Sequence, residues 1–283
     1  LELCQVLPII LNFNMKKFLY IFASVCSLLF VSCEEDITLD FDKNVPRLVI
    51  EGNLFVGETD YNKIHLSTTT DFYSGVFPTV NNAEVTIKDT DSNTVYQFAN
   101  VGNGDFTNEL FQPEIGGNYE LTVVYNNETY KATSTLLATP EILTVDQKDD
   151  GGFGGDSYEI TFNFQDNANE ENYYLVQMIS PVDNYFGVTD DKFTNGNIMN
   201  DLYFFDKEDL KSGDNLNHYI TSINKQYHQY LSKLLSISGD SGNPFSSPMG
   251  TIKGNIVNQT NQSNFALGYF HIAKRNHYTY TVK

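Results

Sequence analysis

Apolar and polar residues alternate along much of the chain from Arg47 onward, a pattern typical of half-buried β-strands. In residues 119–123, Tyr, Leu and Val alternate with Glu and Thr. Other alternating sets are Leu48, Ile50 and Leu54; Ile64 and Leu66; Val85 and Ile87; and Tyr96 and Phe98. Asn126-Asn127 predicts a two-residue hairpin turn, because Asn tolerates positive φ. This succession of short strands predicts an immunoglobulin-like β-sandwich over residues 47–139.

The later part of the chain shows a similar pattern with longer polar interruptions. Residues 158–164 alternate between apolar and polar side chains, which predicts a strand, and residues 172–180 are its expected antiparallel partner. Residues 181–200 are polar and we expect them to be irregular. Closing strands are expected at 265–272 and 278–282. We therefore expect a second β-rich domain over residues 140–283.

One long amphipathic helix is predicted over residues 214–238. Its apolar residues recur with alternating spacings of four and three, which places them on one helical stripe. They are Leu216, Ile220, Ile223, Tyr227, Tyr230, Leu234 and Ile237. Asp214 can cap the start of this helix and Gly239 its end. We expect the stripe to dock on the chain's own sheet, and a coiled-coil seam is the alternative. The predicted fold class is mainly β, with a sandwich followed by a β-rich region that carries this helix.

Residues 15–32 have the composition of a secretory signal peptide. The first methionine is followed by two lysines and an apolar run that ends at Ser32. A basic start, a short apolar stretch and a small residue before the cleavage point are typical of such a signal. A bilayer-spanning helix needs about 20 apolar residues, so cleavage is the better interpretation. Residues 1–14 are expected to be an upstream extension outside the fold.

The apolar run ends in Phe30-Val31-Ser32-Cys33, which resembles the bacterial lipobox. In that motif the cysteine thiol receives a diacylglycerol and the new N-terminus is then acylated. Several acyl chains anchor a protein far more firmly than one chain does. We therefore expect a lipid anchor on Cys33, and an ordinary secretory signal is the alternative.

An acidic run follows the predicted anchor and begins a polar tether over residues 33–46. Glu34, Glu35 and Asp36 resemble the run that sends lipoproteins of Bacteroidota to the cell surface. We therefore expect an outer-membrane lipoprotein that is exposed at the cell surface. The periplasmic face of the outer membrane is the alternative location.

Charge and cysteine content restrict the functional classes. The chain has a formal net charge of −19, and loss of residues 1–32 removes one acidic and two basic residues, which gives −20. A surface of this sign repels nucleic acid, so no DNA or RNA partner is expected. The other two cysteines precede the cleavage point. Cys33 would therefore be the only remaining cysteine, which leaves no disulfide framework and no cysteine nucleophile.

Two local patterns are candidates for chemistry. Asp149, Asp150 and Asp156 flank a glycine-rich stretch and could ligate Ca²⁺, although the EF-hand spacing is absent and a solvated loop is the simpler interpretation. Ser241 lies in a Gly-Asp-Ser-Gly sequence like that around chymotrypsin-like serines, but no histidine has the matching upstream context. The five histidines show no metal-ligand spacing. No catalytic residue and no cofactor is therefore expected.

A set of short segments, taken in order, resembles a known family. The segments are 47–52 (RLVIEG), 83–87 (AEVTI), 117–123 (GNYELTV), 223–231 (INKQYHQYL), 243–248 (NPFSSP), 254–256 (GNI) and 268–270 (GYF). They resemble the Bacteroidota outer-membrane lipoproteins grouped as domain of unknown function 4249, over essentially the whole mature chain. Such proteins are often encoded beside TonB-dependent transporters. The resemblance therefore implies a transporter-associated surface lipoprotein, and it brings no catalytic residues.

The expected function is that of a non-enzymatic accessory of a TonB-dependent outer-membrane transporter, which captures ligand or caps the channel. An independent adhesin or glycan-binding surface module is the alternative. An exposed aromatic cluster would mark the binding surface in either case. The candidate aromatic residues are Tyr73, Phe77, Tyr185, Phe186, Tyr203, Phe204 and Phe205.

Overall fold

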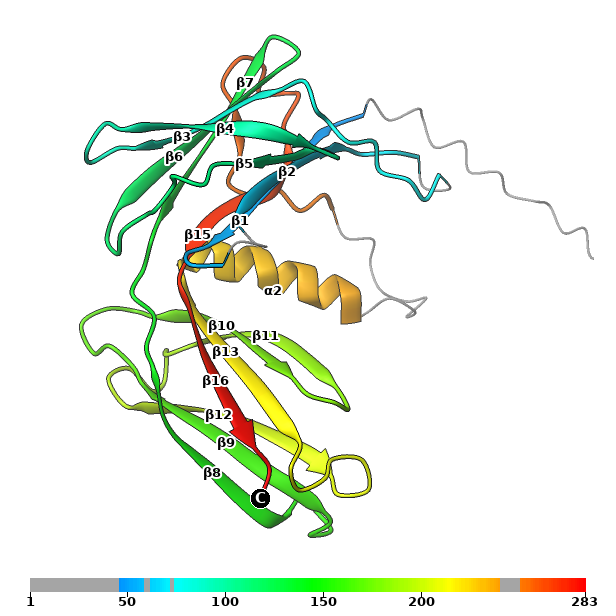
Figure 1. Cartoon of the computed structure of the whole chain (residues 1–283), viewed down its shortest axis with the longest axis vertical. Coiled ribbons are helices and arrows are strands. Elements are labelled where there is room, and N and C mark those ends of the chain that lie inside the picture. The colour runs from blue at the N-terminus through cyan, green and yellow to red at the C-terminus, as the bar shows by residue number, and fades with distance from the viewer. Residues whose placement is uncertain (1–45, 59–61, 72–73, 240–249) are drawn as a thin grey trace, which may run out of the picture. The chain divides into compact units, whose positions relative to one another are not determined.

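The computed structural model describes residues 46–58, 62–71, 74–239 and 250–283. In these ranges the regular structure is almost entirely β, and α2 (Lys225–Gly239) is the only helix. The strands form one nine-stranded sheet and two smaller sheets of four and three strands (Figure 1). The mainly β fold class predicted from the alternation is confirmed.

The nine-stranded sheet folds over on itself to form what we call the first sandwich. Its strands are β1 (Leu48–Phe55), β2 (Lys63–Thr68), β3 (Glu84–Asp89), β4 (Val95–Gly102), β5 (Asp105–Thr107), β6 (Asn118–Tyr125), β7 (Glu128–Thr135), β14 (Val257–Asn258) and β15 (Leu267–Ala273). The order is β14-β7-β6-β3-β4-β5-β2-β1-β15. Strand β4 joins the two halves, because its start pairs with β3 and its end with β5. Asn126 and Asn127 have φ of 49° and 62° and turn β6 into β7, as predicted.

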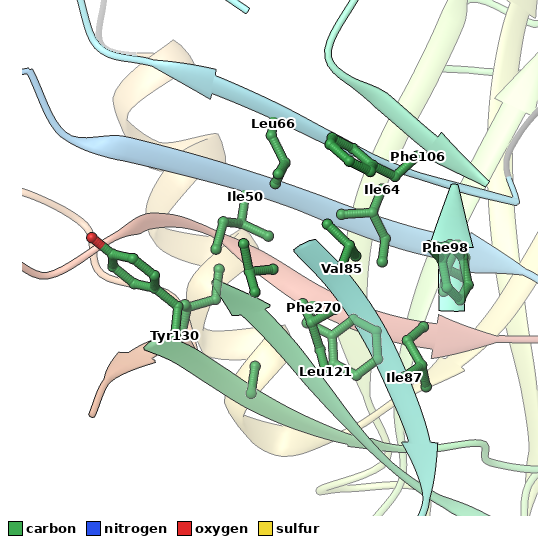
Figure 2. Packing of buried hydrophobic residues seen from close by; sticks show 14 of the residues in the cluster. Ile50, Ile64, Leu66, Val85, Ile87, Phe98, Phe106, Leu121, Tyr130 and Phe270 are labelled. Carbon is green, nitrogen blue, oxygen red and sulfur yellow. The ribbon is translucent and has the colours of Figure 1, made fainter. Parts of the chain in front are cut away.

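The core of the first sandwich receives side chains from both halves of its sheet. Ile50 and Ile64 from one half pack with Val85 and Leu121 from the other, and all four are fully buried (Figure 2). Each such side chain contributes about 2 kcal/mol by leaving water. Phe270 of β15 lies in the same core, although β15 is far from the other strands in sequence. The first sandwich is therefore built from two distant parts of the chain.

The two smaller sheets pack together as the second sandwich. Its strands are β8 (Ile142–Gly151), β9 (Ser157–Gln165), β10 (Tyr173–Ile179), β11 (Asn184–Asp190), β12 (Ile198–Asp206), β13 (Asn215–Ile223) and β16 (Arg275–Thr281). The sheet orders are β11-β10-β13-β16 and β12-β9-β8. Phe162 of β9 and Met178 of β10 meet in the core between them. The expectation that residues 181–200 are irregular is wrong, since they contain β11 and the start of β12. The polar residues beside these strands obscured their alternation in the sequence.

The segment between β13 and β16 leaves the second sandwich and completes the first. Strand β15 pairs in parallel with β1, from Val49 with Leu267 to Phe55 with Ala273, and β14 pairs antiparallel with β7. Residue 139 lies in the connection between β7 and β8. The contiguous second domain predicted over 140–283 nevertheless differs from the structure at β14 and β15. Alternation indicates that a strand exists but not which sheet it joins.

The predicted helix over 214–238 is wrong in its first part. Residues Asn215–Ile223 form β13, and the helix begins only at Lys225. Leu216 and Ile220 are four residues apart, which is an even number and thus a multiple of the two-residue repeat of a strand. This spacing therefore places both side chains on one face of a strand as readily as on one face of a helix.

The true start of α2 has its own cap. Asn224 Oδ1 accepts a hydrogen bond from the Tyr227 amide at 2.8 Å, which is the geometry of an N-cap. Asp214, the predicted cap, instead accepts a hydrogen bond from the Lys211 amide in the turn before β13. Tyr227 and Leu231 of α2 are buried, so the helix does dock on the chain's own strands as predicted.

Candidate functional site

The predicted lipid anchor lies outside the described residues. Cys33 and the acidic run Glu34, Glu35 and Asp36 precede residue 46, so lipid attachment and surface export stay predictions. Ser241 also lies outside them, in the stretch 240–249. Among the residues with described positions, no helix is long and apolar enough to cross a membrane.

The structure does not bring the three candidate calcium ligands together as a set. Asp149 and Asp150 lie at the end of β8, Asp156 lies just before β9, and all three are exposed. Asp149 Oδ1 accepts a hydrogen bond from Gln147 at 2.7 Å. In the described ranges no group of three or more His, Cys, Asp or Glu side chains is placed to hold a metal ion. The glycine-rich stretch is thus a solvated turn between two strands.

A hollow of about 540 Å³ lies in the second sandwich between strands β11 and β12. Each of these strands is the edge of its sheet, with a hydrogen-bonded neighbour on one side only. We call the hollow the β11–β12 groove. Its apolar lining includes Val176 and Met178 from β10, Tyr185 from β11, and Leu202, Tyr203 and Phe204 from β12. Asp183 and Asn200 contribute polar groups to the lining.

The outward face of β12 is apolar, which sets it apart from its sheet. Ile198, Leu202 and Phe204 alternate with inward residues and are 57, 47 and 53 % exposed. The outward positions of the neighbouring strand β9 are polar, as Thr161 and Asn163 show. Exposed apolar side chains on an unpaired strand edge favour association with another molecule. The groove and this face share Leu202 and Phe204 and together form the candidate binding surface.

Two polar groups are buried beneath the groove without partners. The Tyr203 hydroxyl and His218 Nδ1 have no hydrogen-bond partner among the described atoms. His218 Nε2 lies 2.9 Å from Asp201 Oδ2, and its ring stacks on Phe162 with the centroids 4.5 Å apart. Burial raises the pKa of the Tyr203 hydroxyl. Because His218 is fully buried, its imidazole holds β12 to β13 and does not meet a molecule in the groove.

Four of the seven aromatic residues singled out from the sequence gather at the groove: Tyr185, Tyr203, Phe204 and Phe205. The rings of Tyr185 and Tyr203 meet edge to face, with centroids 5.5 Å apart. Phe186 is partly exposed on β11, Phe77 lies apart on the first sandwich, and Tyr73 is outside the described residues. Ile198 and Leu202 were not among the residues predicted from the sequence to form a binding surface. The signal for them was a strand with apolar residues at both odd and even positions.

Helix α2 contacts both sandwiches. Its residues Tyr227 and Leu231 belong to one buried cluster with Leu175 of β10 and Tyr269 of β15. The Tyr227 hydroxyl donates a hydrogen bond to Asn53 Oδ1 of β1 at 3.0 Å. The helix therefore links the second sandwich to the strands that close the first.

A second buried histidine lies under this helix. His271 of β15 has its ring centroid 4.4 Å from that of Tyr227. Neither ring nitrogen has a hydrogen-bond partner among the described atoms. Burial lowers the pKa of His271 to about 3, so the imidazole is neutral in the folded protein. This histidine serves packing and not proton transfer.

Comparisons with known proteins give one family match and several distant structural similarities. The model of the family "Domain of unknown function (DUF4249)" matches residues 34–279. A two-domain fibronectin type III segment of chicken tenascin is 12% identical, with 63% of this chain and 91% of that chain covered and a TM-score of 0.21. The chicken interferon gamma receptor alpha chain is 9% identical, with 63% and 88% covered and a TM-score of 0.20. A search of curated proteins finds no match. The architecture described above rests on the strand pairing alone.

Proposed function

We propose, on the premise that the chain belongs to the family of domain of unknown function 4249, that it is a non-enzymatic accessory binding protein of the outer membrane. In this proposal lipid on Cys33 holds it at the cell surface, and it partners a TonB-dependent transporter. The contact is made by the β11–β12 groove and the outward face of β12. The observation that carries the proposal is the apolar face of β12 beside an aromatic groove.

The chemistry of this surface favours a protein partner. Interface cores are enriched in Tyr, Phe and Met and depleted of charged residues, which describes Tyr185, Met178 and Phe204. A stable protein interface buries about 800 Å² of surface on each partner, which is more surface than the lining of the groove alone exposes. The outward face of β12, with Ile198 and Leu202, supplies the additional area.

The edge strands offer a second means of recognition. Strands β11 and β12 each expose backbone N–H and C=O groups along the edge that has no neighbour in its sheet. An extended segment of a partner can pair with such an edge, while side-chain pockets supply specificity. Tyr185 and Phe204 then provide the apolar contacts on either side of the paired segment.

The buried His218–Asp201 pair supports binding over catalysis. A general base must come within hydrogen-bond reach of the proton that it takes. His218 is fully enclosed by its neighbours, including the Phe162 ring stacked on it. Its role in the proposal is to fix the floor of the groove.

The proposal is tested by the paired substitution Leu202→Glu with Phe204→Glu in the full-length lipoprotein. Cross-linking, detergent solubilisation and mass spectrometry should recover a TonB-dependent transporter with the wild type. The double variant should recover at least about tenfold less, since buried charges disrupt an apolar interface centre. Leu143→Glu is the matched control, because Leu143 is equally exposed on β8, the opposite edge of the same sheet.

Failure to recover any transporter with the wild type would overturn the proposed partnership. Equal loss in the Leu143→Glu control would show that charge alone, and not the β12 face, is responsible. Glycan-array binding that needs no transporter and is lost in the double variant would favour the alternative of a glycan-binding module on the same surface. Circular dichroism of each variant checks that the fold is intact.

A further inference from the structure

Two aspartates are almost completely buried where the β9–β10 and β11–β12 connections meet. Asp166 follows β9 and is 3% exposed, and Asp191 follows β11 and is 2% exposed. Asp166 Oδ1 accepts a hydrogen bond from the Tyr174 hydroxyl at 2.6 Å, and Asp166 Oδ2 accepts one from the Gly196 amide at 2.8 Å. Buried carboxylates are costly unless they are paired with a cation or fully hydrogen-bonded. The Asp191 carboxylate is not fully hydrogen-bonded.

Asp191 has one carboxylate oxygen with no partner. Its Oδ2 is buried and has no hydrogen-bond partner among the described atoms. Burial and the negative charge of Asp166 raise the pKa of the Asp191 carboxyl. The other charged group that acts on it is Asp190, which is also acidic. Both charged groups that act on the Asp191 carboxyl are therefore negative.

The side-chain oxygen of Asn172, a residue directly beside Asp191, faces hydrogen-bond acceptors only, and its NH₂ group faces donors. The Asp191 amide donates a hydrogen bond to the Asn172 carbonyl at 3.1 Å, so the two residues are neighbours. The side-chain oxygen of Asn172 is 2.8 Å from the Asn167 carbonyl oxygen, 3.2 Å from that of Glu170 and 3.3 Å from Asp166 Oδ1. Oxygens that bind one Ca²⁺ at 2.3–2.6 Å lie about 3 Å from each other. The spacing observed here matches that of a calcium shell.

Two arrangements relieve the repulsion between these oxygens. The Asn172 amide can turn, so that its NH₂ group donates to Asn167, Glu170 and Asp166. That turn gives no hydrogen bond to Asp191 Oδ2, which stays buried and unpaired. A cation held among the oxygens relieves both problems at once. It neutralises the two aspartates and leaves the amide oxygen facing a positive charge.

We propose that this cluster is a divalent-cation site of calcium type. Its ligands are the carboxylates of Asp166 and Asp191, the side-chain oxygen of Asn172, and the main-chain oxygens of Asn167 and Glu170. Ca²⁺ accepts six to eight oxygens and mixes carboxylates with carbonyls, whereas Mg²⁺ requires a stricter octahedron. Water completes the shell through a hollow of about 730 Å³ lined by Asp166, Asn167, Glu170 and Asn172.

The ion would have a structural role near the candidate binding surface. Asp166 and Asn172 lie at the two ends of the connection from β9 to β10, and Asp191 begins the connection from β11 to β12. A cation bound by both connections fixes the ends of β11 and β12, the strands that flank the groove. It acts independently of what the groove binds.

The test is a titration of the full-length protein with Ca²⁺ by calorimetry and with Tb³⁺ by luminescence. Tyr174 donates its hydroxyl hydrogen bond to Asp166, so it is placed to sensitise Tb³⁺ emission at the site. We expect one ion per chain with a Kd of about 0.1–1 mM or tighter, as in extracellular calcium modules, and weaker binding of Mg²⁺. Ca²⁺ should raise the melting temperature relative to EDTA.

Asp191→Asn and Asp166→Asn should each weaken Ca²⁺ binding at least about tenfold, because each removes a charged ligand. Asp150→Asn is the matched control, since Asp150 is an exposed aspartate elsewhere in the same sandwich. In EDTA the Asp191→Asn variant should melt at the same temperature as the wild type or above it, because it removes an unpaired buried carboxylate. This readout also shows that the variant folds.

Wild-type protein that gives neither heat nor sensitised emission, and melts at the same temperature in Ca²⁺ and EDTA, would overturn the proposal. That result would mean a turned Asn172 amide and no cation beside Asp191. Loss of binding in Asp150→Asn but not in Asp191→Asn would also overturn it, and would place the ion in the glycine-rich turn. Should Asp166→Asn fail to fold, the Asp191→Asn titration decides alone.

Discussion

The first and second sandwiches differ in what lies beside their edge strands. In the first sandwich the terminal strands β14 and β15 both come from the segment inserted between β13 and β16. Strand β15 covers β1, and Tyr269 and His271 of β15 are in turn covered by α2. In the second sandwich β11 and β12 remain at the edges and enclose the groove. The candidate binding surface therefore arises from the two edge strands that line the groove and not from the type of fold.

The two buried histidines sharpen this contrast. His218 of the second sandwich is bonded to Asp201, whereas His271 of the first sandwich is buried against aromatic rings without any partner among the described atoms. A paired buried histidine fixes two strands to each other. An unpaired one occupies space that an apolar side chain could fill at lower cost.

The largest expected effect concerns the pairing that completes the first sandwich. Gly268 has φ +90°, and a Cβ placed on it would lie 2.1 Å from the Ile50 carbonyl oxygen of β1. Gly268→Ala should lower the free energy of unfolding by about 4 kcal/mol, or prevent folding, because backbone must move to admit the methyl group. Urea unfolding followed by circular dichroism measures it.

Gly213→Ala is the control for backbone strain alone. Gly213 has φ +96°, but nothing lies within 4 Å of the added Cβ. We expect a loss of about 1 kcal/mol from the left-handed conformation. Equal losses at the two glycines would mean that the close approach of β15 to β1 contributes little to stability.

The second prediction is a loss of stability in acid that originates in the first sandwich. The pKa of His271 is about 3 in the folded protein and near 6.5 when the chain unfolds. The unfolded state therefore binds the proton first, and stability falls as the pH drops from 6.5 toward 3. At pH 5 this one group should cost about 2 kcal/mol. His271→Leu should abolish that part of the pH dependence in urea unfolding measured between pH 7 and pH 5.

At neutral pH the leucine substitutions should have opposite signs in the two sandwiches. His271→Leu should raise the free energy of unfolding by about 1 kcal/mol, because it removes two unsatisfied nitrogens. His218→Leu should lower it by about 2 kcal/mol, because it leaves the Asp201 carboxylate without its partner. The same sign for both would show that hydrogen bonding does not distinguish them.

The smallest expected effect tests where the connecting helix begins. Asn224→Ala should lower the free energy of unfolding by about 1 kcal/mol through loss of the N-cap. It should also fray the first turn of α2, which helix-sensitive circular dichroism detects. Asp214→Ala should leave the helical signal unchanged. A loss of that signal in Asp214→Ala would restore the longer helix that the sequence spacing predicted.

Much of the first sandwich could be predicted because its strands alternate strictly. Ile50, Val85 and Leu121 face one core, and the residues directly before and after each of them face the other side of the sheet. Strand β13 could not be separated from α2 in the same way, because the spacing of Leu216 and Ile220 fits both structures. The parallel pairing of β1 with β15 depends on contacts across the whole chain, which local periodicity does not contain.

The candidate sites were harder to predict than the fold. Aromatic residues such as Tyr185 and Phe204 could be singled out, but only the structure shows that the edge strands β11 and β12 line one groove. The predicted calcium candidate at 149–156 relied on sequence proximity of acidic residues. The site at Asp166 and Asp191 is formed by two connections that are separate in the sequence, and it includes main-chain oxygens. The positions of acidic residues along the sequence indicate neither the meeting of the two connections nor the main-chain ligands.

The return of the inserted segment to the first sandwich determines the order in which the protein can be completed during synthesis. Strand β1 emerges from the ribosome early, yet its parallel partner β15 emerges only after the second sandwich is almost finished. Until then the edge of β1 is open to other chains, which is the situation that promotes aggregation. The domain whose strands are synthesised first therefore stays incomplete until almost the end of synthesis, and any delay in the arrival of β15 prolongs the exposure of the β1 edge.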